Sequence, residues 1–479
     1  MDPSEFRRHG HALVEWIAAY LSGSERYPVL PRVAPGEVRR ALPERSPEAG
    51  ECFDEIFADF ERILVPALTH WNHPGFFAYF PATTSASGIL AEFLSAALNQ
   101  QAMLWRTSPA ATELEEVSLA WLRGLVGPPN AFDGVIYDTA SISSLHALAA
   151  ARQVAVPEVR ARGLAARPDV GALRVYCSEQ AHSSIDKAVL TLGLGQSSLR
   201  RIPVDDQHSM RPHALRAALD EDRLAGIRPV AVVATIGTTS TTAIDPVDAV
   251  ADICRDHHIW LHVDAAYAGV AAMLPECAPF FAGWDRADSI VINPHKWLFT
   301  PFDLSAFYCR RMEVVREAFS LVPEYLQTPE ASEGARNLMD TGIQLGRRFR
   351  SLKLWMVLRH FGAARLRRIL AGHIRLAHEF AARVDEHPDF ERLAPVPFGV
   401  VCLRANPRAL RLGPAELDRF NQRLLDAVNG TGEVFLSHTR VNGAFVIRIA
   451  IGHLRTTGAH THRAWELLSQ HTAALAVAS

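Results

Sequence analysis

Between residues 86 and 360 of this 479-residue chain, short apolar runs alternate with stretches of helical character. Alternation of this kind predicts a mainly parallel sheet with helices on both faces, an α/β fold. It leaves the order and direction of the edge strands open. Strands are expected at Gly134–Tyr137, Leu173–Cys177, Val230–Thr235, Ile259–Val263, Ser289–Ile292 and Leu304–Tyr308. Helices are expected between most of them, for example at Ser144–Val154, Pro212–Leu219 and Pro246–His257.

The first 85 residues have a helical character of their own. Asp2-Pro3-Ser4-Glu5 is typical of a helix start, and that helix should end near Ser22, before Gly23. After a proline-rich link, apolar residues at helical spacing from Phe53 to Leu64 predict a second amphipathic helix. The apolar stripes of the two helices pack either on their own chain or on a second subunit.

A change of character near Gly362 marks the start of a smaller C-terminal α+β region. It is expected to open with a long helix over Ala363–His387. Strands are predicted at Gly399–Leu403, Glu433–Ser437 and Phe445–Ile451, and further helices at Pro414–Val428 and Thr461–Ala474. The expected domains are therefore an N-terminal helical segment at 1–85, a large α/β domain at 86–360 and a small domain at 361–479.

Charge and cysteine usage exclude several classes of protein. The formal net charge is only −3, and basic residues are scattered, so no nucleic-acid or membrane partner is expected. No apolar run is long enough for a transmembrane helix, and the N-terminus has no signal-peptide core. The six cysteines lack the close spacing of a metal site or a disulfide framework. We therefore expect reduced thiols, no bound metal and a cytoplasmic location.

Two charged residues stand where predicted strands end. Asp264 follows the apolar run that begins at Ile259, and Lys296 follows the run that ends at Ile292. In open α/β sheets ligands bind at the carboxyl ends of the strands. A lysine there can form a Schiff base, and an aspartate can keep a pyridine nitrogen protonated. Pyridoxal phosphate needs both groups from its protein.

Sequence blocks around these residues resemble the aromatic L-amino acid decarboxylase family of pyridoxal-phosphate enzymes, and the resemblance covers essentially the whole chain. The matching blocks are His262-Val263-Asp264-Ala265-Ala266-Tyr267, Asn293-Pro294-His295-Lys296-Trp297, Phe6-Arg7-Arg8, Thr69-His70-Trp71, Phe76–Pro81, Ser108-Pro109-Ala110, Ala181-His182-Ser183-Ser184 and Leu345–Lys353. The resemblance implies fold type I, the aspartate-aminotransferase-like architecture. It also implies a homodimer in which the N-terminal helices wrap around the partner.

The resemblance further implies a role for each matching residue. Lys296 should carry the cofactor covalently, Asp264 should pair with the ring nitrogen, and His182 should stack on the ring opposite Ala266. Thr139, Ala140 and Ser141, which follow a strand and precede a helix, are expected to bind the phosphate. Further cofactor contacts are implied for Asn293, His295 and Thr239, and Arg448 matches a basic residue that lies near the site in the family.

The expected substrate wall is apolar and aromatic, as a pocket for a flat ring should be. It comprises Trp71, Tyr79, Phe80, Pro81, Ala82, Met103 (from either subunit) and Gly346. None of these is basic, which argues against glutamate, and Gly346 resembles the aromatic-acid enzymes rather than histidine-specific relatives. Ala82 and Met103 depart from mammalian dopa decarboxylases, so indole and phenyl substrates are as consistent with the wall as dopa. Ile142 also departs from the animal enzymes, and no mechanism accounts for it.

Tyr325 matches a tyrosine that, in the family, lies on a mobile loop and protonates Cα after CO2 leaves. Related aldehyde synthases carry phenylalanine there or lack the histidine matching His182, and this chain has both residues. The sequence therefore favours decarboxylation of a small-molecule aromatic L-amino acid. The alternatives are a decarboxylating aldehyde synthase, a decarboxylase of histidine or another amino acid, a non-catalytic homologue and an aminotransferase.

Overall fold

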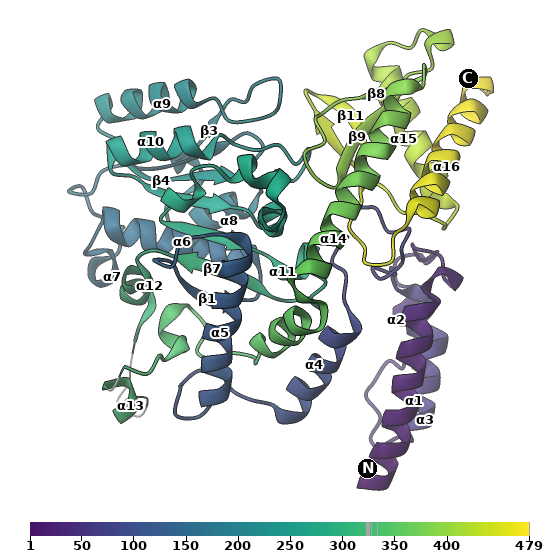
Figure 1. Ribbon diagram of the computed structural model, residues 1–479, viewed down its shortest axis with the longest axis horizontal. Coiled ribbons are helices and arrows are strands. Elements are labelled where there is room, and N and C mark those ends of the chain that lie inside the picture. Colours follow the sequence, from purple (N-terminus) through teal and green to yellow (C-terminus); the bar gives the residue numbers. More distant parts are fainter. Residues whose placement is uncertain (322–325, 327, 333, 479) are drawn as a thin grey trace. The chain divides into compact units, whose positions relative to one another are not determined.

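The computed structural model describes residues 1–321, 326, 328–332 and 334–478. The chain divides into two compact units, which are described separately (Figure 1). The larger unit comprises Ala82–His378 and Ala394–Val401, and the smaller comprises Met1–Pro81, Glu379–Leu393 and Cys402–Ser479. The three-part division predicted from the sequence stays a prediction.

A seven-stranded sheet forms the centre of the larger unit. Its order is β1 (Asp133–Tyr137), β7 (Ser305–Cys309), β6 (Ser289–Ile292), β5 (Trp260–Asp264), β4 (Arg228–Thr235), β2 (Leu173–Ser178) and β3 (Leu199–Ile202). Strand β7 runs antiparallel to both neighbours, and the other pairings are parallel. The expected α/β fold and all six predicted strands are confirmed. The sequence missed β3, a short edge strand in which two adjacent arginines separate Leu199 from Ile202.

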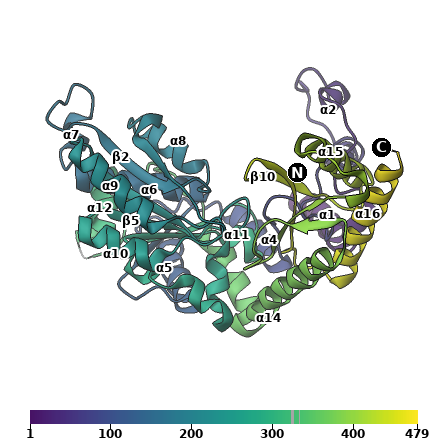
Figure 2. The ribbon, with the colours of Figure 1, turned by 90° about the horizontal axis from the view of Figure 1, so that it is seen from above.

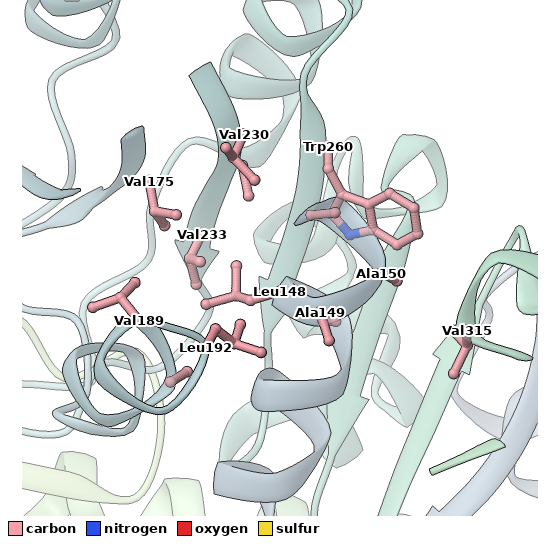
Figure 3. Packing of buried hydrophobic residues seen from close by; sticks show 14 of the residues in the cluster. Leu148, Ala149, Ala150, Val175, Val189, Leu192, Val230, Val233, Trp260 and Val315 are labelled. Carbon is pink, nitrogen blue, oxygen red and sulfur yellow. The ribbon is translucent and has the colours of Figure 1, made fainter. Parts of the chain in front are cut away.

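Helices cover both faces of this sheet (Figure 1). One face carries α6 (Ala140–Ala155), α8 (Ser184–Thr191) and α12 (Met312–Phe319), and the other carries α9 (Pro212–Leu224) and α10 (Val247–His257). Helix α6 is rich in alanine where it meets the strands, so its backbone can approach the sheet closely. Figure 3 shows Leu148, Ala149 and Ala150 of α6 among valines of β2 and β4, in the apolar core of the larger unit. Burial of these side chains stabilises the sheet that positions the functional residues.

The smaller unit contains a four-stranded sheet. Its order is β10 (Ser437–Val441), β11 (Ala444–Ala450), β9 (Val400–Ala405) and β8 (Phe390–Arg392). Helix α15 (Pro414–Gly430) packs on β11 and against α16 (Gly458–Val477) (Figure 2). The predicted strand at Glu433–Ser437 is wrong, because β10 begins at Ser437. Phe435 instead pairs with an earlier segment, donating to Gly75 O at 3.0 Å and accepting from Phe77 N–H at 2.9 Å.

The N-terminal helix forms as its capping residues predict. Helix α1 (Pro3–Ser22) begins after Asp2, whose carboxylate accepts from Ser4 and Glu5 N–H. Trp16 of α1 packs its ring against Phe57 and Phe60, on α3 (Phe53–Asp59) and the π-helical turn that continues it to Leu64. The two apolar stripes therefore meet within one chain, although Phe6 stays 59% exposed.

Seven further α-helices lie among the described residues. They are α2 (Glu37–Ala41), α4 (Ala86–Leu98), α5 (Pro109–Val126), α7 (Val159–Arg162), α11 (Pro294–Trp297), α13 (Pro329–Ser332) and α14 (Ser351–Glu386). Helix α14 is interrupted at Gly362, whose φ of 65° is non-helical, at the place where the sequence changes character. Among the helices described, none has the length and apolar character that crossing a membrane requires.

Candidate active site

The predicted cofactor residues of the larger unit gather at one edge of its sheet. Asp264 is the last residue of β5 and is in register with Thr235 at the end of β4 and Val291 in β6. Thr139 follows β1, and Lys296 lies in α11 directly after β6. Because these strands are parallel, their carboxyl ends share an edge. Residues that are far apart in the sequence are thus brought to one place.

Asp264 is held rigidly at the end of its strand. Its side chain is buried, and its Oδ1 accepts the N–H of Ala266 at 3.1 Å. His262 points to the same face of β5, between the hydroxyls of Ser144 and Ser289 at 3.1 and 2.9 Å. Burial lowers the pKa of His262 to about 4, so the ring stays neutral beside Asp264 at pH 7. On this face of β5, Asp264 therefore offers a carboxylate next to an uncharged imidazole.

Lys296 lies on a short helical turn whose neighbours are firmly packed. Trp297 is buried, stacks on Tyr267 with ring centroids 4.9 Å apart, and donates to His373 Nδ1 at 3.0 Å. The Lys296 side chain itself is half-buried. The turn can therefore present an amine at a fixed position near the strand ends.

His182 is close enough to both charged residues to respond to them. Desolvation lowers its pKa although part of the ring is exposed, Asp264 opposes that shift, and Lys296 adds to it. Its Nδ1 accepts the Ser184 N–H at 3.1 Å. The neutral ring then carries its proton on Nε2. His182 follows β2, which runs parallel to β4 and β5, so it lies at the same carboxyl edge of the sheet as Asp264.

The start of helix α6 offers a site for an anion. Thr139 occupies the N-cap position in extended conformation, but no side chain caps the helix there. The first N–H groups of a helix have no partner within the helix, and the helix dipole favours negative charge at this end. The hydroxyl of Thr139 bonds to Asp138 at 3.0 Å, so the backbone N–H groups of Ala140 and Ser141 are the donors available for a phosphate.

Asn293 offers a second donor, as its bond to His295 shows. Burial lowers the pKa of His295 to about 3, and its Nδ1 accepts the Leu304 N–H at 2.8 Å, so the neutral ring has its proton on Nε2. That N–H lies 3.2 Å from the Asn293 amide and has to donate to the amide oxygen. The other end of the amide is buried without a hydrogen-bond partner among the described residues. The unpartnered end of the Asn293 amide is therefore its NH₂ group, a donor suited to an anion.

Thr239 lies on a tight turn after β4. Gly237 has a φ of +87°, and a Cβ at that position would lie 2.7 Å from the Cβ of Ala268. The N–H groups of Gly237 and Thr238 both donate to Ala243 O at 3.0 Å, which fixes the turn. Only glycine fits here. Thr239 is exposed at the tip of the turn.

Part of the predicted substrate wall belongs to the smaller unit. Trp71 stacks near Tyr79 with ring centroids 6.0 Å apart. Tyr79 has a φ of 52°, which is strained for a tyrosine, and its side chain is 55% exposed. Arg448 is buried, donates to the Tyr79 carbonyl and lies 4.6 Å from the centre of the Phe80 ring. Arg448 therefore positions these aromatic residues, next to the buried Pro81.

The other wall residues lie in the larger unit, and Tyr325 lies outside the described residues. Ala82 is half-buried. Met103 packs with Leu104, Leu326 and Met339, and its carbonyl accepts the Met339 N–H at 3.1 Å. A Cβ on Gly346 would lie 3.0 Å from Gln101 Nε2, so a larger residue would displace that amide.

Taken together, the residues of the larger unit fit pyridoxal phosphate. The uncapped start of α6 and the Asn293 amide are suited to the phosphate, Asp264 to the ring nitrogen, and Lys296 to the aldehyde. Two supporting residues, Ser184 and His262, stand in the matching sequence blocks, but the sequence analysis gave them no role. Strand alternation places His262 on the same face as Asp264, and this signal could have identified it. Nothing local marks Ser184 beyond its position two residues after His182.

Comparisons with known proteins agree with this chemistry. The model of the pyridoxal-dependent decarboxylase conserved domain matches residues 35–406. A phenylacetaldehyde synthase of Petunia hybrida is 38% identical over 98% of this chain and 95% of its own. The aromatic-L-amino-acid decarboxylase of Sus scrofa is 40% identical over 97% and 96%. A crystal structure of Oryza sativa TDC with PLP and tryptamine superposes with a TM-score of 0.96 at 36% identity, covering 99% of both chains.

Proposed function

Because the chain belongs to the pyridoxal-phosphate-dependent decarboxylases of the aromatic L-amino acid decarboxylase family, we propose that it converts aromatic L-amino acids to arylethylamines and CO2. The enzyme is of fold type I and uses pyridoxal phosphate. The observation that supports the proposal is the meeting of Lys296, Asp264 and His182 at one sheet edge. Tryptophan, 5-hydroxytryptophan, tyrosine, phenylalanine and dopa are the candidate substrates.

The resemblance to the family implies each proposed role, and the positions of the described side chains support it. When bound, pyridoxal phosphate accepts the electron pair that remains at Cα as CO2 departs. Lys296 supplies the amine that holds the cofactor covalently. The Asp264 carboxylate, fixed by the Ala266 N–H, keeps a proton on the ring nitrogen. The resemblance to the family implies that the flat ring of His182 would stack on the bound cofactor, with Ala266 on the opposite face.

The substrate is oriented by apolar contacts in this proposal. Trp71, Tyr79 and Phe80 offer flat surfaces to an aromatic side chain. Arg448, a basic residue that contacts this group, is buried and engaged with Tyr79 and Phe80. A substrate with a distal carboxylate would therefore lose its hydration without gaining an accessible cation. Tyr325 returns a proton to Cα after CO2 leaves.

Decarboxylating aldehyde synthesis is the second candidate, since the Petunia hybrida relative is named a phenylacetaldehyde synthase. We favour the decarboxylase because His182 and Tyr325 are both present in this chain. The two activities differ in their products, amine for one and aldehyde for the other.

We further propose that the enzyme is a cytoplasmic homodimer. Phe6, Val14 and Ile56 are 59%, 44% and 46% exposed on the N-terminal helices, an apolar surface that a second copy would cover. All six cysteines are free thiols, as in a reducing compartment.

A substrate panel tests the proposed specificity. Purified enzyme with added pyridoxal phosphate is given tryptophan, 5-hydroxytryptophan, tyrosine, phenylalanine, dopa, histidine or glutamate, and CO2 and amine are measured. We expect amine from ring-bearing acids and none from the Lys296→Ala control. Turnover of glutamate alone would show that the wall is not the substrate pocket, while leaving the cofactor assignment intact.

A further inference from the structure

A hollow of about 850 Å³ lies at the other edge of the seven-stranded sheet, where the parallel strands begin. Its walls come from the starts of β4 and β5, the residues after β7, and the last turns of α6 and α10. The proposed active site is at the carboxyl edge, so this hollow is separate from it. Its volume falls within the range of small-molecule sites.

The lining of the hollow is strongly basic. Asp288 is its one carboxylate, against six arginines: Arg223, Arg228, Arg255, Arg286, Arg310 and Arg311. Three of the arginines have acidic partners. Arg311 pairs with Asp288 at 3.0 Å, whereas Arg255 and Arg286 share Asp252 at 3.0 and 2.8 Å.

The other three arginines bond to backbone carbonyls. Arg228 donates to Ala155 O at 2.9 Å and Arg223 to His257 O at 2.8 Å, at the last residues of α6 and α10. Arg310 donates to the carbonyls of Asp285 and Ala287. No carboxylate of the described chain lies within salt-bridge distance of these three side chains. Arg223 and Arg228 each use one guanidinium nitrogen to cap a helix end. The other N–H groups of each guanidinium remain as possible donors to a ligand.

One wall of the hollow is apolar. Val154, which is 41% exposed, and Pro229 at the start of β4 both line the hollow. Trp260, drawn at the start of β5 in Figure 3, lies deeper in the same wall, and the Arg311 guanidinium is 4.7 Å from its ring centre. The hollow thus combines a small apolar surface with a cluster of guanidinium groups.

We propose that this hollow binds a multiply charged organic phosphate of nucleotide size. The phosphates contact Arg223, Arg228 and Arg310, and a flat ring rests against Val154 and Pro229. Guanidinium groups bind phosphate oxygens in a planar, two-pronged geometry. A neighbouring imidazole nitrogen, Nδ1 of His257, is buried without a partner among the described residues and supplies another polar contact.

Isothermal titration of the holoenzyme tests the proposal, because the bound cofactor fills the anion site at α6. ATP, ADP, adenosine and tripolyphosphate are compared at constant ionic strength. We expect saturable ATP binding with a Kd below about 1 mM, and binding of tripolyphosphate or adenosine at least about tenfold weaker. No saturable ATP binding, or equal binding of tripolyphosphate, would overturn the proposal.

Matched arginine variants locate the binding. The double variant Arg223→Gln/Arg228→Gln keeps an amide donor for each helix carbonyl but removes both charges, and should weaken ATP binding at least about tenfold. Arg160→Gln is the control, because Arg160 also bonds to carbonyls, of Glu317 and Ser320, and does not line the hollow. Equal ATP affinity in the double variant and the control would contradict the site. Unchanged melting temperatures without ATP would exclude unfolding as the cause.

Discussion

Asp264 and Asn293 are assigned to opposite ends of the cofactor, so their substitution should have different consequences. In the proposed mechanism Asp264 acts on the cofactor ring, which accepts electrons, and Asn293 acts on the phosphate, where no bond changes. Substituting the two residues should therefore separate an effect on kcat from an effect on cofactor affinity.

Asp264→Asn should retain the cofactor but lose activity. The amide keeps the shape of the carboxylate and its bond from Ala266, but it no longer stabilises a protonated ring nitrogen. We expect kcat to fall by a factor of about 10²–10³, roughly 3–4 kcal/mol of transition-state stabilisation. Amine release measures the rate, and absorbance of bound cofactor measures occupancy. Loss of cofactor with an unchanged rate in the occupied fraction would refute the assignment.

Asn293→Ala should show the opposite pattern. Removal of the unpartnered amide donor costs about one charge-assisted hydrogen bond to the phosphate, so cofactor affinity should fall about tenfold. At saturating cofactor, kcat should stay within about threefold of the unsubstituted enzyme. Titration of the apoenzyme with pyridoxal phosphate gives the affinity. An unchanged affinity would mean that Asn293 bonds to His295 but does not bind the phosphate.

The functional residues at strand ends could be predicted from the sequence, whereas the hydrogen bonds that hold the site together could not. Lys296 and Asp264 stand out because each follows an apolar run. The bond from Ser144 to His262 spans 118 positions, and no local pattern indicates it. The orientation of the Asn293 amide depends on the proton of His295, which only the folded environment determines.

At the scale of elements, a buried ion pair fixes the segment that follows the Tyr325 region. Arg347 and Glu115 are both buried and lie 2.7 Å apart. Arg347 also donates to Ile136 O in β1 at 2.7 Å, and Glu115 accepts the Ile136 N–H at 2.8 Å. The segment carrying Gly346 is thereby tied to β1 and α5.

Glu115→Gln should destabilise the larger unit strongly. The introduced amide would still accept the Ile136 N–H, but the Arg347 charge would be buried without a partner of opposite sign, which costs about 3–5 kcal/mol. Urea unfolding followed by circular dichroism measures the loss. The double variant Glu115→Gln/Arg347→Met should regain much of it, because no charge remains buried. A loss below about 1 kcal/mol in the single variant would contradict this account.

The elements missed by the sequence share a physical reason. Strands β3 and β8 are short and lie at sheet edges, so their residues lack a long apolar run. The apolar stretch before Ser437 is extended as predicted, but Phe435 pairs with the chain at Gly75 and Phe77 rather than within the four-stranded sheet. Sequence periodicity identifies extended backbone and does not choose its partner.

At the scale of the whole molecule, buried neutral histidines should make stability depend on pH. Burial lowers the pKa of His73, His146 and His262 to about 4 and of His295 to about 3. The unfolded chain binds these protons near pH 6.5, so the unfolding free energy should fall as the pH drops from 6.5 towards 4. Each of these shifts is worth roughly 3–5 kcal/mol once the pH is below the folded-state pKa.

Urea unfolding at pH 7.5, 6.5, 5.5 and 4.5 tests that dependence. His262→Gln should have a shallower slope, because one buried titrating group is removed from between Ser144 and Ser289. A flat profile between pH 6.5 and 5.5 would contradict the prediction.

The proposed homodimer makes a further prediction at this scale. Phe6→Glu/Ile56→Glu places charge on the exposed apolar surface of the N-terminal helices and should weaken association by at least about tenfold. Sedimentation velocity across a dilution series measures it. Leu224→Glu is the control, since Leu224 is 91% exposed at the end of α9. If the unsubstituted protein is a monomer at all concentrations, the proposed homodimer is wrong.

The most direct test of the central claim is the product ratio from a single aromatic substrate. Enzyme, pyridoxal phosphate and tryptophan are incubated in air, and CO2, tryptamine, indole acetaldehyde and hydrogen peroxide are measured together. We predict one molecule of tryptamine for each CO2, with no peroxide. The Lys296→Ala variant should release neither tryptamine nor CO2. Aldehyde and peroxide in place of amine would contradict the decarboxylase and identify an aldehyde synthase.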